Sequence, residues 1–196
     1  MESNSESHKR RLLRLKEYDY SLPGAYFITL ITKNREHLFG EIQNGQMVLN
    51  EYGKIVHEEY IKLSEIPIIE LDVFQIMPDH IHGVIIIREN DLNPAQEIKK
   101  PIQAWIIHKL QHNLNIQKYR RNMILPKIIG RFKTLSSKRI NQLRQTRGFP
   151  VWQRNYYERV VRNEIELKRI REYIINNPIN WEIEKLIKFE FWPNSF

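Results

Sequence analysis

The chain has 196 residues, which suits one domain or one domain with appendages, and its 41% hydrophobic and 28% charged residues are normal for a globular protein. It contains no cysteine, which excludes disulfide frameworks, thiolate zinc sites and cysteine nucleophiles. The net charge of +8 favours a polyanionic partner such as nucleic acid, and no apolar run is long enough to span a membrane. Because the N-terminus is polar and lacks the apolar core of a signal peptide, we expect a cytoplasmic protein.

The first half of the chain predicts the order strand, helix, strand, strand after a basic arm over residues 1–17. A tight hairpin turn is expected at Asn44-Gly45, and Asn50 is expected to cap a helix that runs to Leu63. Three runs rich in β-branched and aromatic residues predict longer strands at residues 26–32, 68–77 and 80–87. This order is half of a split β-α-β arrangement.

The middle of the chain predicts a loop and two helices. Residues 101–118 form an amphipathic pattern that contains His108 and His112, four positions apart on one helical face. Because no carboxylate accompanies them in an HExxH pattern, a solvated face is favoured over a metal site. The second helix is expected over residues 128–143. Its buried stripe is predicted to consist of Phe132, Leu135, Ile140 and Leu143.

The last third of the chain predicts an extended segment and a terminal helix. Residues 151–161 look extended. Asn163 is a candidate N-cap, followed by acidic residues in the first turn, where the helix dipole favours negative charge. We expect this helix to run to about Asn177 and to end at Pro178.

The most informative short motif is Asp79-His80-Ile81-His82. Side chains two positions apart on a strand point to the same face, so His80 and His82 should project together while Ile81 points into a core. Two neighbouring imidazoles on rigid backbone are a plausible half of a divalent metal site.

The terminal helix supplies a second constellation. Tyr173 and Asn177 lie four residues apart and therefore share a face. A phenol can attack phosphorus if a divalent cation polarises the phosphate, and the amide of Asn177 offers a third, oxygen ligand beside His80 and His82. Tyr156 and Tyr157 are rival nucleophiles, and Tyr173 ranks first because it has a ligand-type partner one turn later.

Basic residues cluster in several segments and alternate with aromatic ones, which suits contacts with phosphates and unstacked bases. The residues that we expect to contact DNA are Arg14, Lys16, Arg131, Lys133, Lys138, Arg139, Arg154 and Arg159.

Together these motifs resemble a known family. Residues 77–82 (MPDHIH) look like the HUH motif of single-tyrosine transposases, and residues 152–163 with 171–178 look like the end of the REP-associated tyrosine transposase (IS200-like) branch. The resemblance implies an α+β fold with a ferredoxin-like antiparallel sheet and helices packed on it, the HUH endonuclease fold. It also implies Mg²⁺ or Mn²⁺ held by His80, His82 and Asn177, with Tyr173 as the catalytic residue.

The function implied is a transposase or endonuclease that cleaves and rejoins single-stranded or hairpin DNA through a 5′-phosphotyrosine intermediate, as a monomer or homodimer. Residues 18–182 would form the transposase domain, with an insert at about 91–127 and a C-terminal tail over 183–196. Two alternatives stay open. One is a catalytically silent, domesticated DNA-binding protein, and the other is a different HUH nuclease such as a replication initiator.

Overall fold

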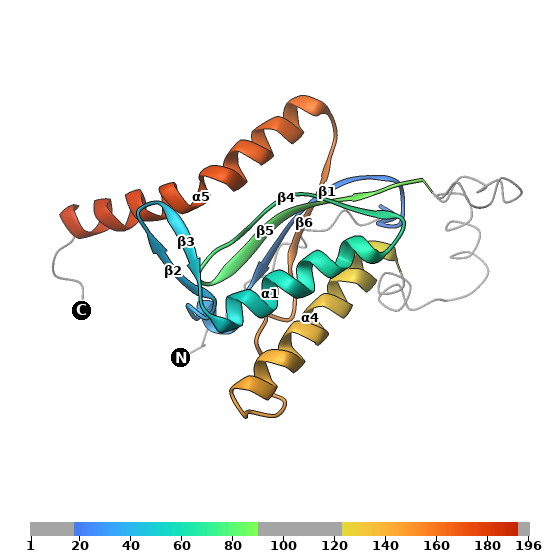
Figure 1. Ribbon diagram of the computed structural model, residues 1–196. Helices are drawn as coiled ribbons and strands as arrows, with labels where there is room; N and C mark the ends of the chain where they lie inside the picture. The colour runs from blue at the N-terminus through green and yellow to red at the C-terminus, as the bar shows by residue number, and fades with distance from the viewer. Residues whose placement is uncertain (1–17, 90–122, 192–196) are drawn as a thin grey trace, which may run out of the picture.

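The computed structural model describes residues 18–89 and 123–191, with residues 186–191 described as backbone only. A four-stranded sheet forms the centre, with α1 and α4 on one side and α5 on the other (Figure 1). Within the described residues, no helix has the length and apolar character needed to cross a membrane.

The sheet has the strand order β4-β5-β1-β6, and every neighbouring pair is antiparallel. Apart from a short two-stranded hairpin, two 3-10 helices and the terminal helix, the order along the described residues is strand, helix, strand, strand, helix, strand. With this sheet order it is the ferredoxin-like split β-α-β arrangement. The α+β, ferredoxin-like prediction is therefore confirmed. The elements of this unit are β1 (Gly24–Ile31), α1 (Glu51–Ile61), β4 (Ile69–Ile76), β5 (His80–Ile87), α4 (Ile124–Leu143) and β6 (Tyr157–Val161).

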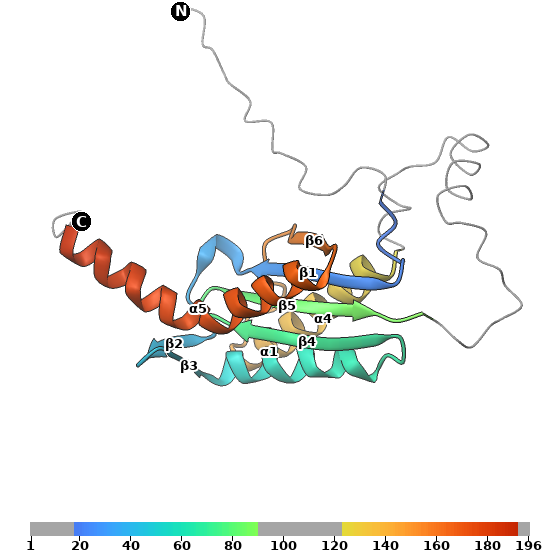
Figure 2. The ribbon, with the colours of Figure 1, turned by 90° about the horizontal axis from the view of Figure 1, so that it is seen from above.

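Each face of the sheet has its own core, because strand side chains alternate between the two faces. The larger core lies under α1 and α4, and it contains Ile28 and Ile81, neither of which is exposed. The smaller core lies under α5 (Glu164–Phe191) and is formed by Val84, Leu167 and Ile174. Viewed from above, α5 crosses the strands of the sheet (Figure 2).

The local signals of the first half are confirmed. The hairpin of β2 (Gly40–Gln43) and β3 (Gln46–Leu49) turns at Asn44-Gly45, whose φ angles of 53° and 71° are those of a two-residue turn of type I′. Asn50 caps α1, since its Oδ1 accepts a hydrogen bond from the backbone N–H of Gly53 at 2.9 Å. A short 3-10 helix over Lys62–Glu65 extends α1.

The predicted buried stripe of α4 is partly wrong. Phe132 and Ile140 are buried, but Leu135 is 37% and Leu143 52% exposed. Leu135 lies outside the face of α4 that carries its buried residues. Leu143 is the last residue of α4, and this end of the helix projects away from the sheet (Figure 1). Ser136 is buried instead, and its hydroxyl accepts a hydrogen bond from Trp152 Nε1 at 3.0 Å.

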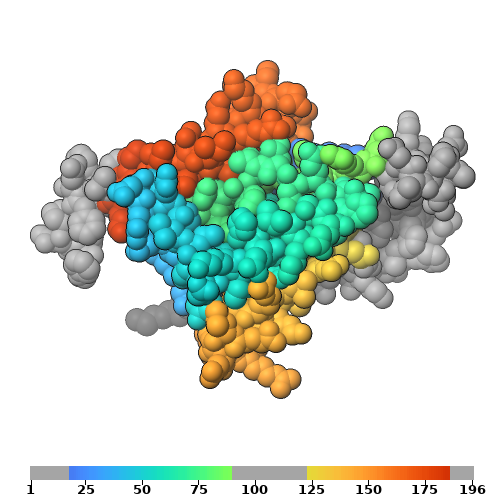
Figure 3. Space-filling model, in the orientation of Figure 1, coloured from blue at the N-terminus to red at the C-terminus, as the bar shows by residue number. Residues whose placement is uncertain are grey.

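The terminal helix does not end at Pro178. Helix α5 contains this proline and continues to Phe191, through part of the segment that the sequence assigned to a C-terminal tail. A proline inside a helix removes one hydrogen bond and bends the axis, and α5 changes direction partway along its length (Figure 2). The later turns are held by the β2–β3 hairpin, where Glu182 Oε2 accepts the N–H of Gly45 at 2.7 Å. Figure 3 shows the hairpin and α5 side by side.

Candidate active site

The two histidines of the central motif lie on adjacent positions of one face of β5. Their ring centroids are 4.5 Å apart, and both side chains are buried, whereas Ile81 between them points into the larger core. In the neighbouring strand β1, Thr29 pairs with His82 and Ile31 with His80. The predicted strand geometry of the pair is therefore confirmed.

Each histidine has a partner at Nδ1. His82 Nδ1 lies 2.8 Å from Thr29 Oγ1, and His80 Nδ1 forms a short contact with Asp79 Oδ1. Arg35 Nη1 donates to the other oxygen of Asp79 at 3.1 Å. Because metal-binding histidines in proteins use their second nitrogen for such contacts, the arrangement fits a pair that offers Nε2 to a cation.

The electrostatics around the pair favour a neutral His82. Burial is the largest cause, and together with His80 and Arg35 it lowers the pKa of His82 to about 3. Burial by itself would raise the pKa of Asp79. The hydrogen bonds and charges of His80 and Arg35 act in the opposite direction, and the net effect is a lowered pKa for this carboxyl. An ionised Asp79 accepts a hydrogen bond from Nδ1–H of His80, which fixes the tautomer of His80.

Helix α5 brings Tyr173 to this pair. The Tyr173 hydroxyl lies 3.2 Å from His82 Nε2, and the two ring centroids are 5.1 Å apart. In the tautomer whose Nδ1–H donates to Thr29, the phenol O–H donates to Nε2 of His82. Tyr173 is also 47% exposed, so a substrate has access to its hydroxyl.

Asn177 and Trp181 follow Tyr173 at intervals of one turn and share its face. The Trp181 ring lies 5.8 Å from the ring of His80 and 5.6 Å from that of His37. Asn177, which is buried, lies on α5 between the residue that contacts His82 and the residue that contacts His80. The helix therefore brings Tyr173 against His82 and Trp181 against His80, with Asn177 on the turn between them.

The start of α5 is fixed locally. Asn163 Oδ1 accepts the backbone N–H of Glu166 at 2.9 Å, as expected for an N-cap. Glu166 Oε2 in turn accepts the N–H of Arg162, the residue before the cap, at 2.9 Å.

The rival tyrosines lie elsewhere. Tyr156 packs against the larger core, on the face away from α5. Tyr157 lies on the α5 face with its ring centroid 6.0 Å from that of Phe27. Among the described residues, Tyr173 is the tyrosine whose hydroxyl bonds to a histidine of the pair.

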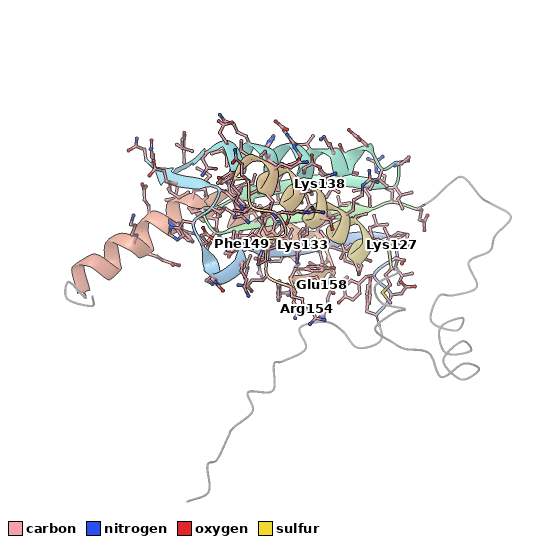
Figure 4. The ribbon with its side chains drawn as sticks, turned by 90° about the horizontal axis from the view of Figure 1, so that it is seen from below. Lys127, Lys133, Lys138, Phe149, Arg154 and Glu158 are labelled. Atoms are coloured by element: carbon pink, nitrogen blue, oxygen red, sulfur yellow. The ribbon has the colours of Figure 1, made fainter. Side chains whose placement is uncertain are left out.

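The residues predicted to contact DNA divide into three groups. Arg14 and Lys16 lie outside the described residues, as do His108 and His112. Arg131, Lys138 and Arg154 are exposed; Figure 4 places Lys138 and Arg154 on the side of the sheet that α4 covers.

The other three predicted contacts are already engaged within the protein. Lys133 donates to the carbonyl oxygens of Gln153 and Arg154, and Arg139 forms ion pairs of 2.7 and 2.8 Å with Glu58 and Glu59. Arg159 pairs with Glu166. These three residues therefore contribute to the fold.

Thr29, Arg35 and Trp181 contribute to the site but were not singled out by any sequence motif. Thr29 becomes recognisable only when the register of β1 against β5 is known, and Trp181 only when α5 continues past Pro178. Among the described residues, no three His, Cys, Asp or Glu side chains are grouped as a metal site. Within the described residues, a third side-chain ligand beside the two histidines would therefore be of another type, such as the amide of Asn177.

Comparisons with known proteins show what the whole chain is similar to. No protein-family model matches the chain. An uncharacterized protein of Haemophilus influenzae is 37% identical over 187 residues, covering 93% of this chain and 96% of the relative. A second protein of that organism, named "Putative REP-associated tyrosine transposase", is 25% identical over 182 residues, covering 90% of this chain and 81% of the relative.

Two solved structures are also similar. One is described as the REP-associated tyrosine transposase bound to a REP hairpin, with 15% identity, a TM-score of 0.46 and coverage of 85% of this chain and 73% of that chain. The other is described as a "putative transposase" from Deinococcus radiodurans R1, with 16% identity, a TM-score of 0.39 and coverage of 83% and 97%. The chain belongs to one family with the uncharacterized H. influenzae protein, and the similarity to REP-associated tyrosine transposases that its motifs indicated is confirmed.

Proposed function

We propose that the chain is a transposase that cleaves and rejoins DNA, with Tyr173 as its nucleophile. The observation that carries this proposal is the position of the Tyr173 hydroxyl, 3.2 Å from His82 Nε2 and accessible to solvent. The sequence similarity to a protein named as a transposase supports the same conclusion.

The proposed reaction is an exchange of phosphodiester bonds. Tyr173 Oη forms a bond to the scissile phosphorus while the bond from phosphorus to the 3′-oxygen breaks. The phenol loses its proton and the leaving 3′-oxygen gains one, which gives a 5′-phosphotyrosine and a free 3′-hydroxyl. Because one phosphodiester replaces another, a 3′-hydroxyl can later attack the phosphotyrosine and regenerate the phenol without an external energy source.

The residues present fit a divalent cation, which we propose to be Mg²⁺ or Mn²⁺. His80 and His82 have their Nδ1 atoms engaged and would bind through Nε2, and Asn177 would add an amide oxygen. When bound, the cation would polarise a phosphoryl oxygen and reduce the charge that Tyr173 has to approach. Asp79 and Thr29 would orient the two imidazoles.

The proposed substrate is single-stranded or hairpin DNA. The net charge of +8 and the exposed Arg131, Lys138 and Arg154 support a polyanionic partner. Since Tyr173 and the histidine pair meet within one chain, one copy supplies all the proposed groups, and the chemistry does not require a dimer.

The deciding experiment is a search for a covalent adduct. The full chain is incubated with Mn²⁺ and hairpin oligonucleotides, labelled at their 3′ ends and taken from the DNA that flanks its gene, and is then analysed on a denaturing gel. We expect a labelled protein band with the unchanged chain and with Tyr156→Phe, and none with Tyr173→Phe or after chelation of the metal. Peptide mapping should locate the DNA on Tyr173.

Two results would contradict the proposal. An adduct formed by Tyr173→Phe, or one mapped to Tyr157, would show that Tyr173 is not the nucleophile. Tight binding of the hairpins without any adduct would favour the silent DNA-binding protein.

A further inference from the structure

Beside Tyr173 the surface is hollowed into a pocket of about 550 Å³, formed by β6, the first turns of α5 and Phe27 of β1. A volume of this size holds a small organic ligand or one unit of a polymer. Because Tyr173 lines the pocket, whatever occupies it lies next to the proposed nucleophile.

One wall of the pocket is aromatic. Phe27 meets Tyr157 and Tyr173 edge to face, with ring centroids 6.0 and 6.2 Å away. Tyr157 is half-buried, so its ring is held in place while part of its surface remains open to the pocket. A fixed aromatic ring of this kind accepts an unstacked nucleobase, whose own ring offers a flat surface.

The rim of the pocket is cationic. Arg162 and Arg169 are exposed, and neither forms an ion pair within the part of the chain that the structure describes. The acidic residue of the lining, Glu166, is already paired with Arg159. Two guanidinium groups are therefore available to an anionic ligand, and guanidinium groups bind phosphate oxygens in a bidentate manner.

We infer that this pocket is a subsite for a nucleotide of a single-stranded DNA segment that adjoins the scissile phosphate. The base stacks on Tyr157, and Arg162 and Arg169 bind the adjoining phosphates. The segment is single-stranded because a base inside a duplex keeps both of its faces stacked on its neighbours. The inference rests on the proposed function, since it takes Tyr173 as the point where the DNA is cut.

The phosphate contacts are tested by binding. Fluorescence anisotropy measures the affinity of the full chain for a labelled oligothymidylate of about twelve nucleotides, which cannot pair with itself. We expect Arg162→Ala with Arg169→Ala to weaken binding roughly tenfold and to reduce the slope of log K against log salt by about 1.4, the value for two single-strand phosphate contacts.

The matched control removes the same charge elsewhere. Lys54→Ala with Arg88→Ala takes two cations from exposed positions, and Arg88 follows the end of β5 that is remote from His80. This variant should bind the oligonucleotide as the unchanged chain does. Equal losses in the two double variants would mean that only net charge matters, and would overturn the subsite.

The stacking contact is tested separately. Tyr157→Phe should bind like the unchanged chain, whereas Tyr157→Leu should bind about 5- to 160-fold more weakly, the range for loss of one stacked base. An abasic strand of the same length should bind Tyr157→Phe and Tyr157→Leu equally. Equal affinities of Tyr157→Phe and Tyr157→Leu for the thymidine strand would overturn the stacking role.

The two proposals fail in different ways. Tyr173→Phe should keep the affinity of the subsite while losing the adduct. If the arginine variant loses affinity but the unchanged chain never forms an adduct, the subsite stands and the proposed reaction fails. If adducts form and the arginine variant binds like its control, the reaction stands and the subsite fails.

Discussion

Arg171 of α5 binds Asp72 of β4 through both Nε and Nη2, at distances between 2.5 and 3.1 Å. Asp72 lies at an irregularity of β4, where the register against β5 shifts between Leu71 and Phe74. The hydrogen bond from Arg171 is the main cause that lowers the pKa of Asp72. This ion pair joins the sheet to the helix two positions before Tyr173.

We predict that Arg171→Ala slows adduct formation more than it destabilises the fold. Loss of a partly exposed ion pair costs about 1 kcal/mol of unfolding free energy. A displacement of Tyr173 by about 1 Å from the histidine pair slows the reaction about 100-fold. Urea denaturation and the rate of adduct formation measure the two effects.

The control for this prediction is Arg88→Ala, which breaks the exposed ion pair between Arg88 and Glu70. It should change the rate little, because this exposed pair joins β4 to the end of β5 that is remote from His80. If Arg171→Ala and Arg88→Ala reduced the rate equally, the ion pair with Asp72 would have no positioning role.

Thr29 provides a second test, because its hydroxyl contacts His82 Nδ1 at 2.8 Å. Thr29→Val keeps the shape of the side chain and removes this contact. We expect it to weaken Mn²⁺ binding by about 10- to 100-fold, the usual cost of losing a group that orients a metal ligand. Isothermal titration calorimetry measures the affinity.

Thr134→Val is the matched change, since the Thr134 hydroxyl bonds to the carbonyl of Gly130 in its own helix. It should leave Mn²⁺ binding unchanged. Unaltered affinity in Thr29→Val would show that Thr29 does not orient His82.

Local signals made much of the fold predictable from the sequence. The alternation of strand side chains is enough to put His80 and His82 on one face, and Asn44-Gly45 and Asn50 act through their own backbone geometry. Each of these signals involves residues within a few positions, so no knowledge of the rest of the molecule is required.

Contacts between distant elements were not predictable in the same way. Thr29 meets His82 only because β1 pairs with β5 in one particular register. Lys133 and Arg139 look like surface cations in the sequence, but acceptors from other elements engage both of them. Pro178 is a helix breaker by itself, yet α5 continues past it, with Glu182 bound to the hairpin turn.

Gly83 provides a prediction about the packing under the site. A Cβ at this position would lie 2.2 Å from Tyr60 Oη, and that hydroxyl is buried with no hydrogen-bond partner among the described residues. Gly83→Ala should therefore destabilise the fold by about 1–3 kcal/mol. The cost should be smaller in a Tyr60→Phe background, since the atom closest to the new methyl group is absent there.

Two urea-denaturation controls accompany this change. Tyr60→Phe alone should be neutral or stabilising by about 1 kcal/mol, because it removes a buried hydroxyl without a partner. Gly130 lies on α4, and no atom is within 4 Å of the position of an added Cβ. Gly130→Ala should therefore stabilise the fold by about 1 kcal/mol, because alanine has the higher helix propensity. Additive effects of Gly83→Ala and Tyr60→Phe would contradict the proposed clash.

The depressed pKa of His82 predicts how the stability of the fold depends on pH. Burial lowers this pKa to about 3 in the folded protein, whereas an unfolded histidine titrates near 6.5. Between these two values the unfolded chain binds a proton that the folded protein does not, so the unfolding free energy falls as pH decreases from about 6.5 to about 3. The contribution of His82 to this dependence is at most about 1.4 kcal/mol per pH unit.

Urea denaturation at pH 4, 5 and 6 should show that the unfolding free energy depends more steeply on pH in the unchanged chain than in His82→Gln. The variant lacks the titrating imidazole but retains the carboxylates that also respond to acid. Equal slopes in the two proteins would mean that His82 is protonated in the folded state at these pH values, and a neutral imidazole would then not be its resting form.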